Sequence, residues 1–462
     1  MSDERSGPSI VWFREDLRVG DNPALLAARE HDRPVVALYV LDEESAGIRP
    51  LGGAAHWWLH GSLASLTTDL EDLGVHLLLR RGPAEEVVTE LADELDASAV
   101  FWNRRYGGAE RAIDTTIKTT LRDRGVEVAS FAASLLFEPW TIQTGAGDPY
   151  SVYTPFWRAC LAAPPPREPL PRPRTIDGWR GRAACNDLAD WQLEPTHPDW
   201  AGGIRDEWEP GEASAHRSLK RFLAEDVGDY DEGRDEPAQD STSKLSPHLR
   251  WGEISPNAVF AAAQERRKGA RGSTATGISR FVSELGWREF AAHVLFHAPD
   301  LATKNWRSEF DAFPWPPLHR SALEAWQQGR TGYPMVDAGM RELWATGYMH
   351  NRVRMITASF LTKNLLIDWR LGEQWFWDTL VDGDGASNPF NWQWVAGSGA
   401  DAAPYFRVFN PELQAKKFDP HGEYVRRWIP EIGTDDYPEP IVDLAETRRA
   451  ALAAYDVVKR SR

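Results

Sequence analysis

A cluster of hydroxyl side chains precedes a predicted helix near the middle of the chain. Residues 240–247 read DSTSKLSP and combine four hydroxyls with one lysine. Hydroxyls together with the free N–H groups of a helix start suit a phosphate or pyrophosphate. Ordinary helix capping explains the same residues and is the simpler interpretation of this motif taken alone.

A second motif, SELGWREF, places three different functional groups on one helical face. Glu284, Trp287 and Arg288 stand at positions i, i+3 and i+4, which are neighbours on a helix surface. A carboxylate, an indole and a guanidinium can together meet a base edge, a ring face and a phosphate. A Glu–Arg pair beside a core tryptophan is the equally acceptable structural alternative.

Two more polar motifs follow towards the C-terminus. In MHNRVRM, Asn351, Arg354 and Met355 share a helical face, where an amide can pair with a base edge and a guanidinium can neutralise an acid or a phosphate. Residues 382–388 read DGDGASN, which is typical of an Asx-type turn or of a metal loop. No closing glutamate stands at the distance that a calcium loop needs, so no metal is expected.

Tryptophan is the unusual feature of the composition. The chain has 22 in 462 residues, and twelve of them lie beyond residue 250, including both ends of WQW at 392–394. Core packing is the ordinary role of any single tryptophan. Indoles also stack on bases and flavins and can pass on single electrons, so their number here indicates more than packing.

Charge is distributed unevenly along the chain. The net charge is −17 at pH 7, yet residues 1–240 hold 25 Lys and Arg against 43 Asp and Glu, whereas residues 241–462 hold 27 against 26. Within 241–288, eight basic residues accompany three acidic ones. A local basic face of this kind is what phosphate binding needs, although a solvated helix face fits the charge pattern as well.

The first 135 residues alternate short apolar runs with amphipathic stretches. This alternation predicts a doubly wound α/β domain, with a parallel sheet covered by helices on both faces. The first predicted strand leads into VWFREDLRVG instead of GxGxxG, so a standard dinucleotide site is not expected there. We expect strands at residues 9–13, 34–41, 75–79, 99–102 and 126–131.

Residues 136–205 are predicted to form a linker, because six prolines within 162–174 exclude a helix or a central strand. From 206 to 462, helical spacing recurs without a strand pattern and predicts an all-α domain. No run of about 18 apolar residues predicts a membrane span, and no signal peptide is visible. Two cysteines, Cys160 and Cys185, indicate a reducing, cytoplasmic location.

Taken together, these motifs resemble the photolyase/cryptochrome family, and most closely its bacterial members that repair cyclobutane pyrimidine dimers. VWFREDLRVGDNPAL resembles the opening strand and turn of the family. The later motifs follow in the family's order and spacing: TSKLSP, ELGWREF, GRTGYPMVDAGMREL, MHNRVRM, LIDWR, DGD, NWQW and DAAPYFRVFNP. The resemblance runs nearly end to end and implies an α/β antenna domain (1–135), the linker (136–205), and a helical domain (206–462) that holds FAD in a U-shaped conformation.

The resemblance assigns one group of residues to FAD. Arg354 is implied to pair with Asp382, and Asn388 to face the reactive central-ring nitrogen of the flavin, where an amide is compatible with a fully reduced, anionic flavin. The implied FAD-binding residues are Tyr230, Thr242, Ser243, Lys244, Leu245, Ser246, Phe281, Arg354, Asp382, Gly383, Asp384 and Asn388.

The resemblance also implies the substrate, which is DNA containing UV-induced pyrimidine dimers. The dimer is extruded from the duplex, and excited, reduced FAD lends it an electron, after which the cyclobutane ring splits and the electron returns. Glu284 and Asn351 are implied to hydrogen-bond the dimer and, with Asn388, to be the catalytic residues. The full implied DNA-binding set is Glu284, Trp287, Arg288, Asn351, Arg352, Met355 and Trp394, in which the tryptophans wall the dimer and the arginines meet phosphates.

Three tryptophans resemble the relay that reduces FAD in this family. They are Trp392, Trp369 and Trp315. The outermost assignment has an alternative, Trp306, because the loop at 313–319 varies in length among family members.

Several alternatives stay open at this stage. A cryptochrome, which senses blue light without repair, would use the same FAD site, whereas a flavoprotein oxidoreductase lacks a visible substrate site. Asn351 after His350 disfavours the branch that repairs (6–4) photoproducts, and two cysteines exclude the iron–sulfur branch. A second, antenna chromophore, either folate or deazaflavin, is possible, because residues 109–110 keep half of the folate-binding Asn-Glu pair. The protein is expected to be a monomer.

Overall fold

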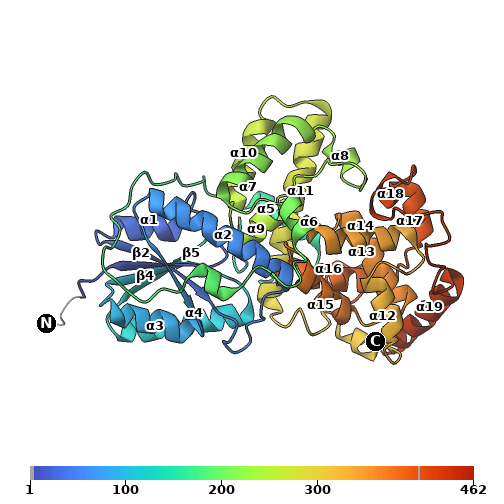
Figure 1. Ribbon diagram of the computed structural model, residues 1–462, viewed down its shortest axis with the longest axis horizontal. Coiled ribbons are helices and arrows are strands. Elements are labelled where there is room, and N and C mark those ends of the chain that lie inside the picture. The colour runs from blue at the N-terminus through green and yellow to red at the C-terminus, as the bar shows by residue number, and fades with distance from the viewer. Residues whose placement is uncertain (1–4, 404–405, 462) are drawn as a thin grey trace.

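The computed structural model describes residues 5–403 and 406–461. Five short apolar segments of the first 131 residues form one parallel sheet (Figure 1). The strand order is β3-β2-β1-β4-β5, and every neighbouring pair is parallel. The predicted strands are confirmed within two residues at each end. Their bounds are β1 (Ser9–Phe13), β2 (Val35–Leu41), β3 (Leu77–Arg81), β4 (Ala99–Asn103) and β5 (Glu127–Phe131).

Helices cover both faces of this sheet, as the sequence predicted. Alternate residues of β1 point to opposite sides, so that Val11 and Phe13 join a core with helices α1 (Pro23–Glu30) and α2 (Gly53–Asp72). Ile10 and Trp12 join a second core with α3 (Ala84–Glu94) and α4 (Gly108–Asp123). Burial on both faces explains why these strands are apolar at nearly every position.

The strand order reverses between β1 and β4, and this position has a consequence for binding. In doubly wound sheets, ligands bind beyond the carboxyl ends of the strands at such a switch point. Arg14 and Glu15 follow β1 directly, and Arg104 and Arg105 follow β4, and all four line a cleft at that edge.

Beyond Phe131, the described residues form helices, short single helical turns and no further strand. The fold class is therefore the predicted one, an α/β part followed by an all-α part. Residues 222–226 and 360–364 are π-helical continuations of α7 and α14. The helices are α5 (Tyr153–Ala162), α6 (Gly202–Glu207), α7 (Glu212–Arg221), α8 (Tyr230–Gly233), α9 (Ser246–Trp251), α10 (Pro256–Arg267), α11 (Gly272–His297), α12 (Arg320–Gln327), α13 (Pro334–Thr346), α14 (Asn351–Ser359), α15 (Trp369–Thr379), α16 (Ser387–Ala396), α17 (Pro411–Phe418), α18 (Glu423–Trp428) and α19 (Leu444–Arg460).

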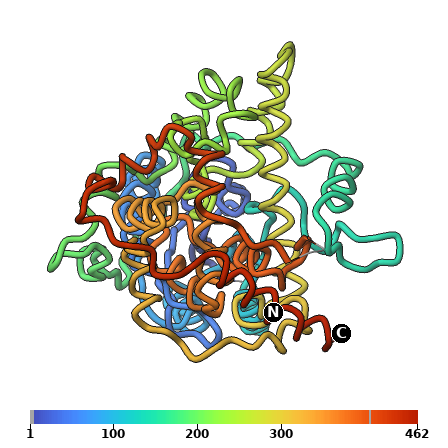
Figure 2. Tube along the Cα trace, turned by 90° about the vertical axis from the view of Figure 1, so that its right-hand side faces the viewer, coloured from blue at the N-terminus to red at the C-terminus, as the bar shows by residue number. Residues whose placement is uncertain are grey.

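The segment predicted as a linker is only partly irregular. Its proline-rich stretch has neither helix nor strand. The helix α5, which precedes this stretch, packs against the long helix α11. In Figure 2 the predicted linker is the teal segment that runs beside α11. Further along, Gly178 bridges to Val35 of the sheet. The segment therefore contacts both parts of the molecule, and its limits at 136 and 205 remain predictions.

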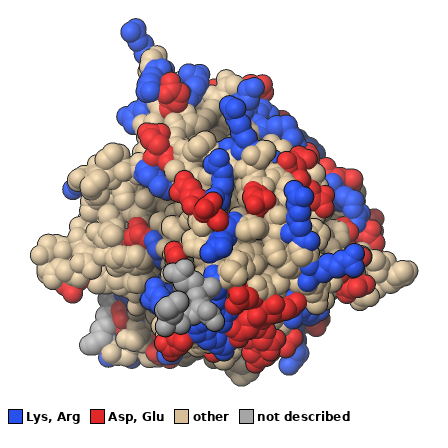
Figure 3. Space-filling model, turned by 90° about the vertical axis from the view of Figure 1, so that its left-hand side faces the viewer, with Lys and Arg blue, Asp and Glu red and all other residues tan. Residues whose placement is uncertain are grey.

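The structure also bears on a membrane span, on the surface charge and on one of the sequence motifs. Among the described residues, no helix is long and apolar enough to cross a membrane. On the face formed by the N-terminal part, basic and acidic side chains are interspersed (Figure 3). Pro404 and Tyr405 of the DAAPYFRVFNP motif lie outside the described residues.

Candidate active site

An open cavity in the helical part collects most of the side chains that the sequence singled out. It lies between α9, α11, α14, α15 and α16, and apolar residues such as Leu285 and Ala358 separate its polar groups. The predicted site residues that line it are Tyr230, Ser243, Leu245, Ser246, Phe281, Glu284, Arg288, Asn351, Arg354, Met355, Asp382, Gly383, Asp384, Asn388 and Trp392.

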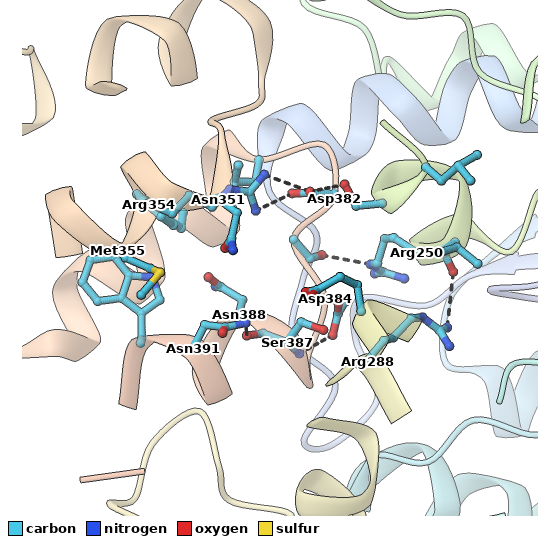
Figure 4. Close-up of a pocket in the computed structure, with 18 of the residues that line it drawn as sticks. Arg250, Arg288, Asn351, Arg354, Met355, Asp382, Asp384, Ser387, Asn388 and Asn391 are labelled. Carbon is cyan, nitrogen blue, oxygen red and sulfur yellow. Dashed lines mark hydrogen bonds and ion pairs between the residues drawn. The ribbon is translucent and has the colours of Figure 1, made fainter. Parts of the chain in front are cut away.

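Arg354 and Asp382 form the predicted ion pair at one end of the cavity (Figure 4). Nη1 and Nη2 of Arg354 lie 3.0 and 2.9 Å from the two oxygens of Asp382, and Ser246 Oγ donates to the same carboxylate at 2.7 Å. Burial is the largest effect and lowers the pKa of Arg354, but Asp382, helped by Tyr348 and Glu342, holds that pKa above its ordinary value. The pair is thus a fixed dipole of two full charges in the cavity wall.

The turn before α16 is built by Asp384. Its Oδ1 accepts from the backbone N–H groups of Ala386 and Ser387 at 2.7 and 2.6 Å, which is the Asx-type turn considered from the sequence. In the same turn, the carbonyl of Gly383 accepts from Nε of the buried Arg250 at 2.9 Å. The turn is therefore rigidly held next to the Arg354–Asp382 pair.

Asn388, in the first turn of α16, is fixed by a residue that sequence reasoning missed. Nδ2 of Asn388 donates to Glu373 Oε1 at 2.8 Å and to the backbone carbonyl of Glu373 at 3.1 Å. Both amide hydrogens are used in these bonds, so the carbonyl oxygen is the polar atom that Asn388 has left for the cavity. Figure 4 shows Asn388 on the opposite side of the open space from Asn351.

Glu284 has a partner that the sequence did not suggest. Its carboxylate forms an ion pair with Arg234, which follows Tyr230 by one helical turn and lies over the Tyr230 ring at 5.6 Å. Burial is the largest effect and lowers the pKa of Arg234, but Glu284, Tyr230 and Asp235 together raise it, and the net shift of the pKa is upward. The spacing of four residues from Tyr230 was the available signal, because it puts both side chains on one face.

Two basic residues do not take the positions expected for them. Lys244 turns away from the cavity and pairs with Glu207 at 2.7 Å and Asp240 at 3.2 Å, and Thr242 is not part of the lining either. Arg288 points towards the N-terminal part, where Nη1 donates to the carbonyl of Ser134 at 2.8 Å. The Arg288 side chain thus links the two parts of the molecule, and its role at a DNA phosphate stays a prediction.

Arg352 also has an acidic partner. Its guanidinium pairs with Asp235 at 2.8 Å and lies 4.4 Å from the Phe418 ring. Its side chain keeps 20% of its exposure, so a phosphate would have to compete with Asp235 for it.

Comparison with known proteins agrees with the resemblance to photolyases that the sequence motifs show. A family model described as DNA photolyase matches residues 9–174, and one described as the FAD binding domain of DNA photolyase matches residues 281–435. A deoxyribodipyrimidine photo-lyase of Agrobacterium fabrum is 50% identical over 482 residues and covers 99% of both chains. The chain belongs to the photolyase/cryptochrome family.

Both branches of the family are among its relatives. Cryptochrome-1 of Arabidopsis thaliana is 38% identical over 92% of this chain and 63% of its own length. A bacterial class III photolyase from Agrobacterium tumefaciens superposes with a TM-score of 0.94 at 49% identity, covering 99% of each chain. An archaeal photolyase from Sulfolobus tokodaii, solved with two FAD molecules, gives a TM-score of 0.81 at 29% identity, covering 97% of this chain and 99% of its own.

Two of the three relay tryptophans predicted for this photolyase/cryptochrome family member, Trp392 and Trp369, are buried, and Trp315 is partly buried. Trp392 lines the cavity, and Trp369 donates from Nε1 to Asn305 at 3.0 Å. Trp315 packs against the same apolar cluster as these two, whereas Trp306 joins a different cluster. The packing thus favours Trp315 over Trp306 as the outer member of the relay.

The two tryptophans predicted as walls for the substrate lie outside the lining of the cavity. Trp287 stacks on Tyr153, with ring centroids 3.7 Å apart and an angle of 11° between the planes. Trp394 donates from Nε1 to the carbonyl of Asp401 at 3.0 Å. Both indoles are held by these contacts and only partly buried, so each still offers ring surface to solvent.

A second cleft of this photolyase/cryptochrome family member lies between the α/β and helical parts, at the strand-order reversal. Residues 109 and 110, which resemble half of a folate-binding pair, line it together with Tyr39 and Trp377. The cleft and the first cavity share Arg250, Asp384 and Ser387 in their walls, so the two sites are adjacent.

Proposed function

We propose that this protein is a light-driven DNA repair enzyme that binds FAD in the cavity of its helical part and splits cyclobutane pyrimidine dimers into monomers. The observation that carries this proposal is the convergence of the Arg354–Asp382 pair, Asn388, Glu284 and Asn351 on one cavity. The photo-lyase relative with 50% identity along the whole chain supports it.

The groups that line the cavity suit FAD. Phe281, Leu285 and Trp392 provide apolar surface for a planar ring system, and the hydroxyl of Ser243 provides a donor for a polar end. When bound and reduced, FAD supplies the light-driven electron that no side chain can supply.

The residues around the cofactor then act by position and charge. The carbonyl of Asn388 would accept a hydrogen bond from an N–H of bound FAD, and the Arg354–Asp382 pair would hold the cofactor through its opposite charges. Glu284 and Asn351 hydrogen-bond the flipped dimer, and the ion pair with Arg234 orients the Glu284 carboxylate. Trp392, which lines the cavity, is the last tryptophan on the path by which electrons reach the cofactor from the surface.

The interdomain cleft is proposed to hold a second, light-harvesting chromophore. It lies at the switch point where doubly wound sheets bind ligands, and it borders the FAD cavity. The Sulfolobus tokodaii relative with two FAD molecules supports a second chromophore in principle, while folate and deazaflavin remain the chemical alternatives from the sequence.

Repair is favoured over a signalling function. A full-length match at 50% identity is a photo-lyase, whereas the cryptochrome relative reaches 38%. Both cysteines are free, which fits the reducing cytoplasm in which we place the protein.

The test is repair of a defined lesion. An oligonucleotide with one cyclobutane thymine dimer is illuminated with near-UV light in the presence of FAD-loaded, chemically reduced protein, and dimer loss is followed chromatographically. We expect loss in the light and none in the dark. Asn351→Ala should slow repair, whereas Gln374→Ala, which changes an exposed amide on α15, should not. An intact dimer after illumination of reduced, FAD-loaded protein would contradict the proposal.

A further inference from the structure

Glu373 connects the FAD cavity to the interdomain cleft. It lies on α15 with 1% of its surface exposed, and on the cavity side its Oε1 and its backbone carbonyl hold the amide of Asn388. An amide held through both of its N–H groups cannot turn over, so its carbonyl stays directed to the cavity.

On the cleft side, Arg49 of the α/β part forms an ion pair with the carboxylate of Glu373. Nη1 and Nη2 of Arg49 lie 2.7 and 2.9 Å from Oε1 and Oε2 of Glu373, which is a bidentate pair. The guanidinium also lies 4.2 Å from the ring of Trp377, and Trp377 Nε1 donates to the carbonyl of Pro50 at 2.9 Å. Arg49 and Trp377 both line the cleft, so this contact reaches from one binding site to the other.

The orientation of Asn388 depends on Glu373, and the charged state and position of Glu373 depend on Arg49. A buried carboxylate without a cationic partner is strongly disfavoured and either takes up a proton or moves towards water. Either change weakens the acceptor that holds Asn388, and a terminal amide turns easily about its last torsion once its partners are lost. Arg49 thus acts on Asn388 through Glu373 without touching the cavity itself.

We infer that Arg49 is a positioning residue for the flavin, through which the α/β part helps to set the redox state of the cofactor. This inference rests on the proposed function, in which Asn388 faces the central-ring nitrogen. Reduction by two electrons and one proton places a hydrogen on that nitrogen, which then donates to the Asn388 carbonyl. The oxidised ring has only a lone pair there and would prefer the N–H groups of a turned amide. The Arg49–Glu373 pair transfers no proton or electron and only keeps the amide in the orientation that favours the reduced flavin.

The test is a redox titration of bound FAD with dithionite as the reductant. Arg49→Gln should lower the preference for reduced over oxidised FAD about tenfold, the usual net effect of one hydrogen bond, which corresponds to a midpoint potential about 30 mV lower for a two-electron couple. Asp378→Ala is the matched control, because Asp378 accepts from the N–H of Gly53 at 2.9 Å and thus joins the same helix to the α/β part without reaching Asn388.

Additional measurements separate this effect from a loss of structure. Arg49→Lys keeps the charge but not the bidentate geometry, so it should fold and shift the same preference about threefold, and it decides the matter if Arg49→Gln does not fold. An unchanged potential in the folded variants, or an equal shift in Asp378→Ala, would overturn the inference even if thermal stability falls. The dissociation constant of FAD is measured in parallel: failure of the unaltered protein to bind FAD would refute the proposed function instead.

Discussion

Lys363 is a buried lysine near Trp394, one of the two tryptophans proposed to contact the substrate. The effect of replacing it by methionine on the free energy of unfolding can be calculated. Its side chain is 2% exposed, its Nζ donates to the carbonyl of Arg407 at 2.7 Å, and the Phe406 ring lies 4.0 Å away. Together with Trp394 it lines a small separate cavity. Burial, assisted by the charge of Arg407, lowers the pKa of Lys363 to about 7.

The cost of burying this amine follows from the shift. A lysine in an unfolded chain titrates near a pKa of about 10.4, and a difference of about 3.4 units at 1.36 kcal/mol per unit is about 5 kcal/mol. Lys363→Met keeps an unbranched side chain that is one atom shorter and removes this cost, but the Arg407 carbonyl loses its donor, which costs about 1–3 kcal/mol. The variant should therefore be about 2–4 kcal/mol more stable at neutral pH.

The pH dependence gives the decisive readout. Because the folded pKa is the lower one, the unfolded chain binds more protons between about pH 7 and pH 10.4, and the unaltered protein gains stability as the pH rises through this window. The ionisation cost that Lys363→Met removes is complete below about pH 7 and vanishes towards about pH 10, so with the lost donor counted the variant should be the more stable protein below about pH 8 and the less stable one above about pH 10. Urea midpoints across this range measure it, with the exposed Lys416→Met as control. An advantage that is the same at every pH, or absent below pH 7, would refute the reasoning.

Other predictions concern the cofactor and the relay. Asp382→Asn should weaken FAD binding at least about tenfold, because the cavity loses one full charge of its ion pair, and a fluorescence titration with unchanged affinity would contradict this. Trp392→Phe should abolish photoreduction, followed by absorbance, yet spare repair once FAD is reduced chemically; persistent photoreduction would remove it from the relay. Trp315→Phe should slow photoreduction more than Trp306→Phe, and the reverse order would exchange the two assignments. Glu284→Gln should lower the quantum yield of repair while FAD stays bound, and an unchanged yield would exclude this carboxylate from the reaction.

The sequence predicted the sheet well because its strands are buried on both faces. VVALYVL of β2 is apolar at every position, and such a run bounded by polar turns has few other interpretations. Helical spacing is weak at α16, SNPFNWQWVA, because this helix is surrounded by protein on most sides and shows no apolar stripe. The prediction missed α5, since its ten residues precede the proline-rich stretch and were grouped with it.

Within the site, the sequence identified residue types better than their partners. Most residues assigned by resemblance do line the cavity, because short-range helical spacing determines which side chains share a face. Arg49 and Glu373 are 324 residues apart, and no local pattern connects them. Lys244 and Arg288 were expected to meet phosphates, but each has protein acceptors nearby, and a sequence shows a charge without showing what already neutralises it.

The α/β part is a structural component of the FAD cavity rather than an appended unit. Arg250, which holds the carbonyl of Gly383, is itself paired with Glu15 at 2.8 Å, immediately after β1. On α2, Trp58 donates from Nε1 to the buried Glu253 at 3.1 Å, and Glu253 also accepts from the N–H of Gly211 at 2.7 Å. A buried carboxylate that satisfies donors from both parts is costly to separate from them. The walls of the cavity and the switch point of the sheet therefore keep a fixed relation, as energy transfer from the proposed second chromophore would require.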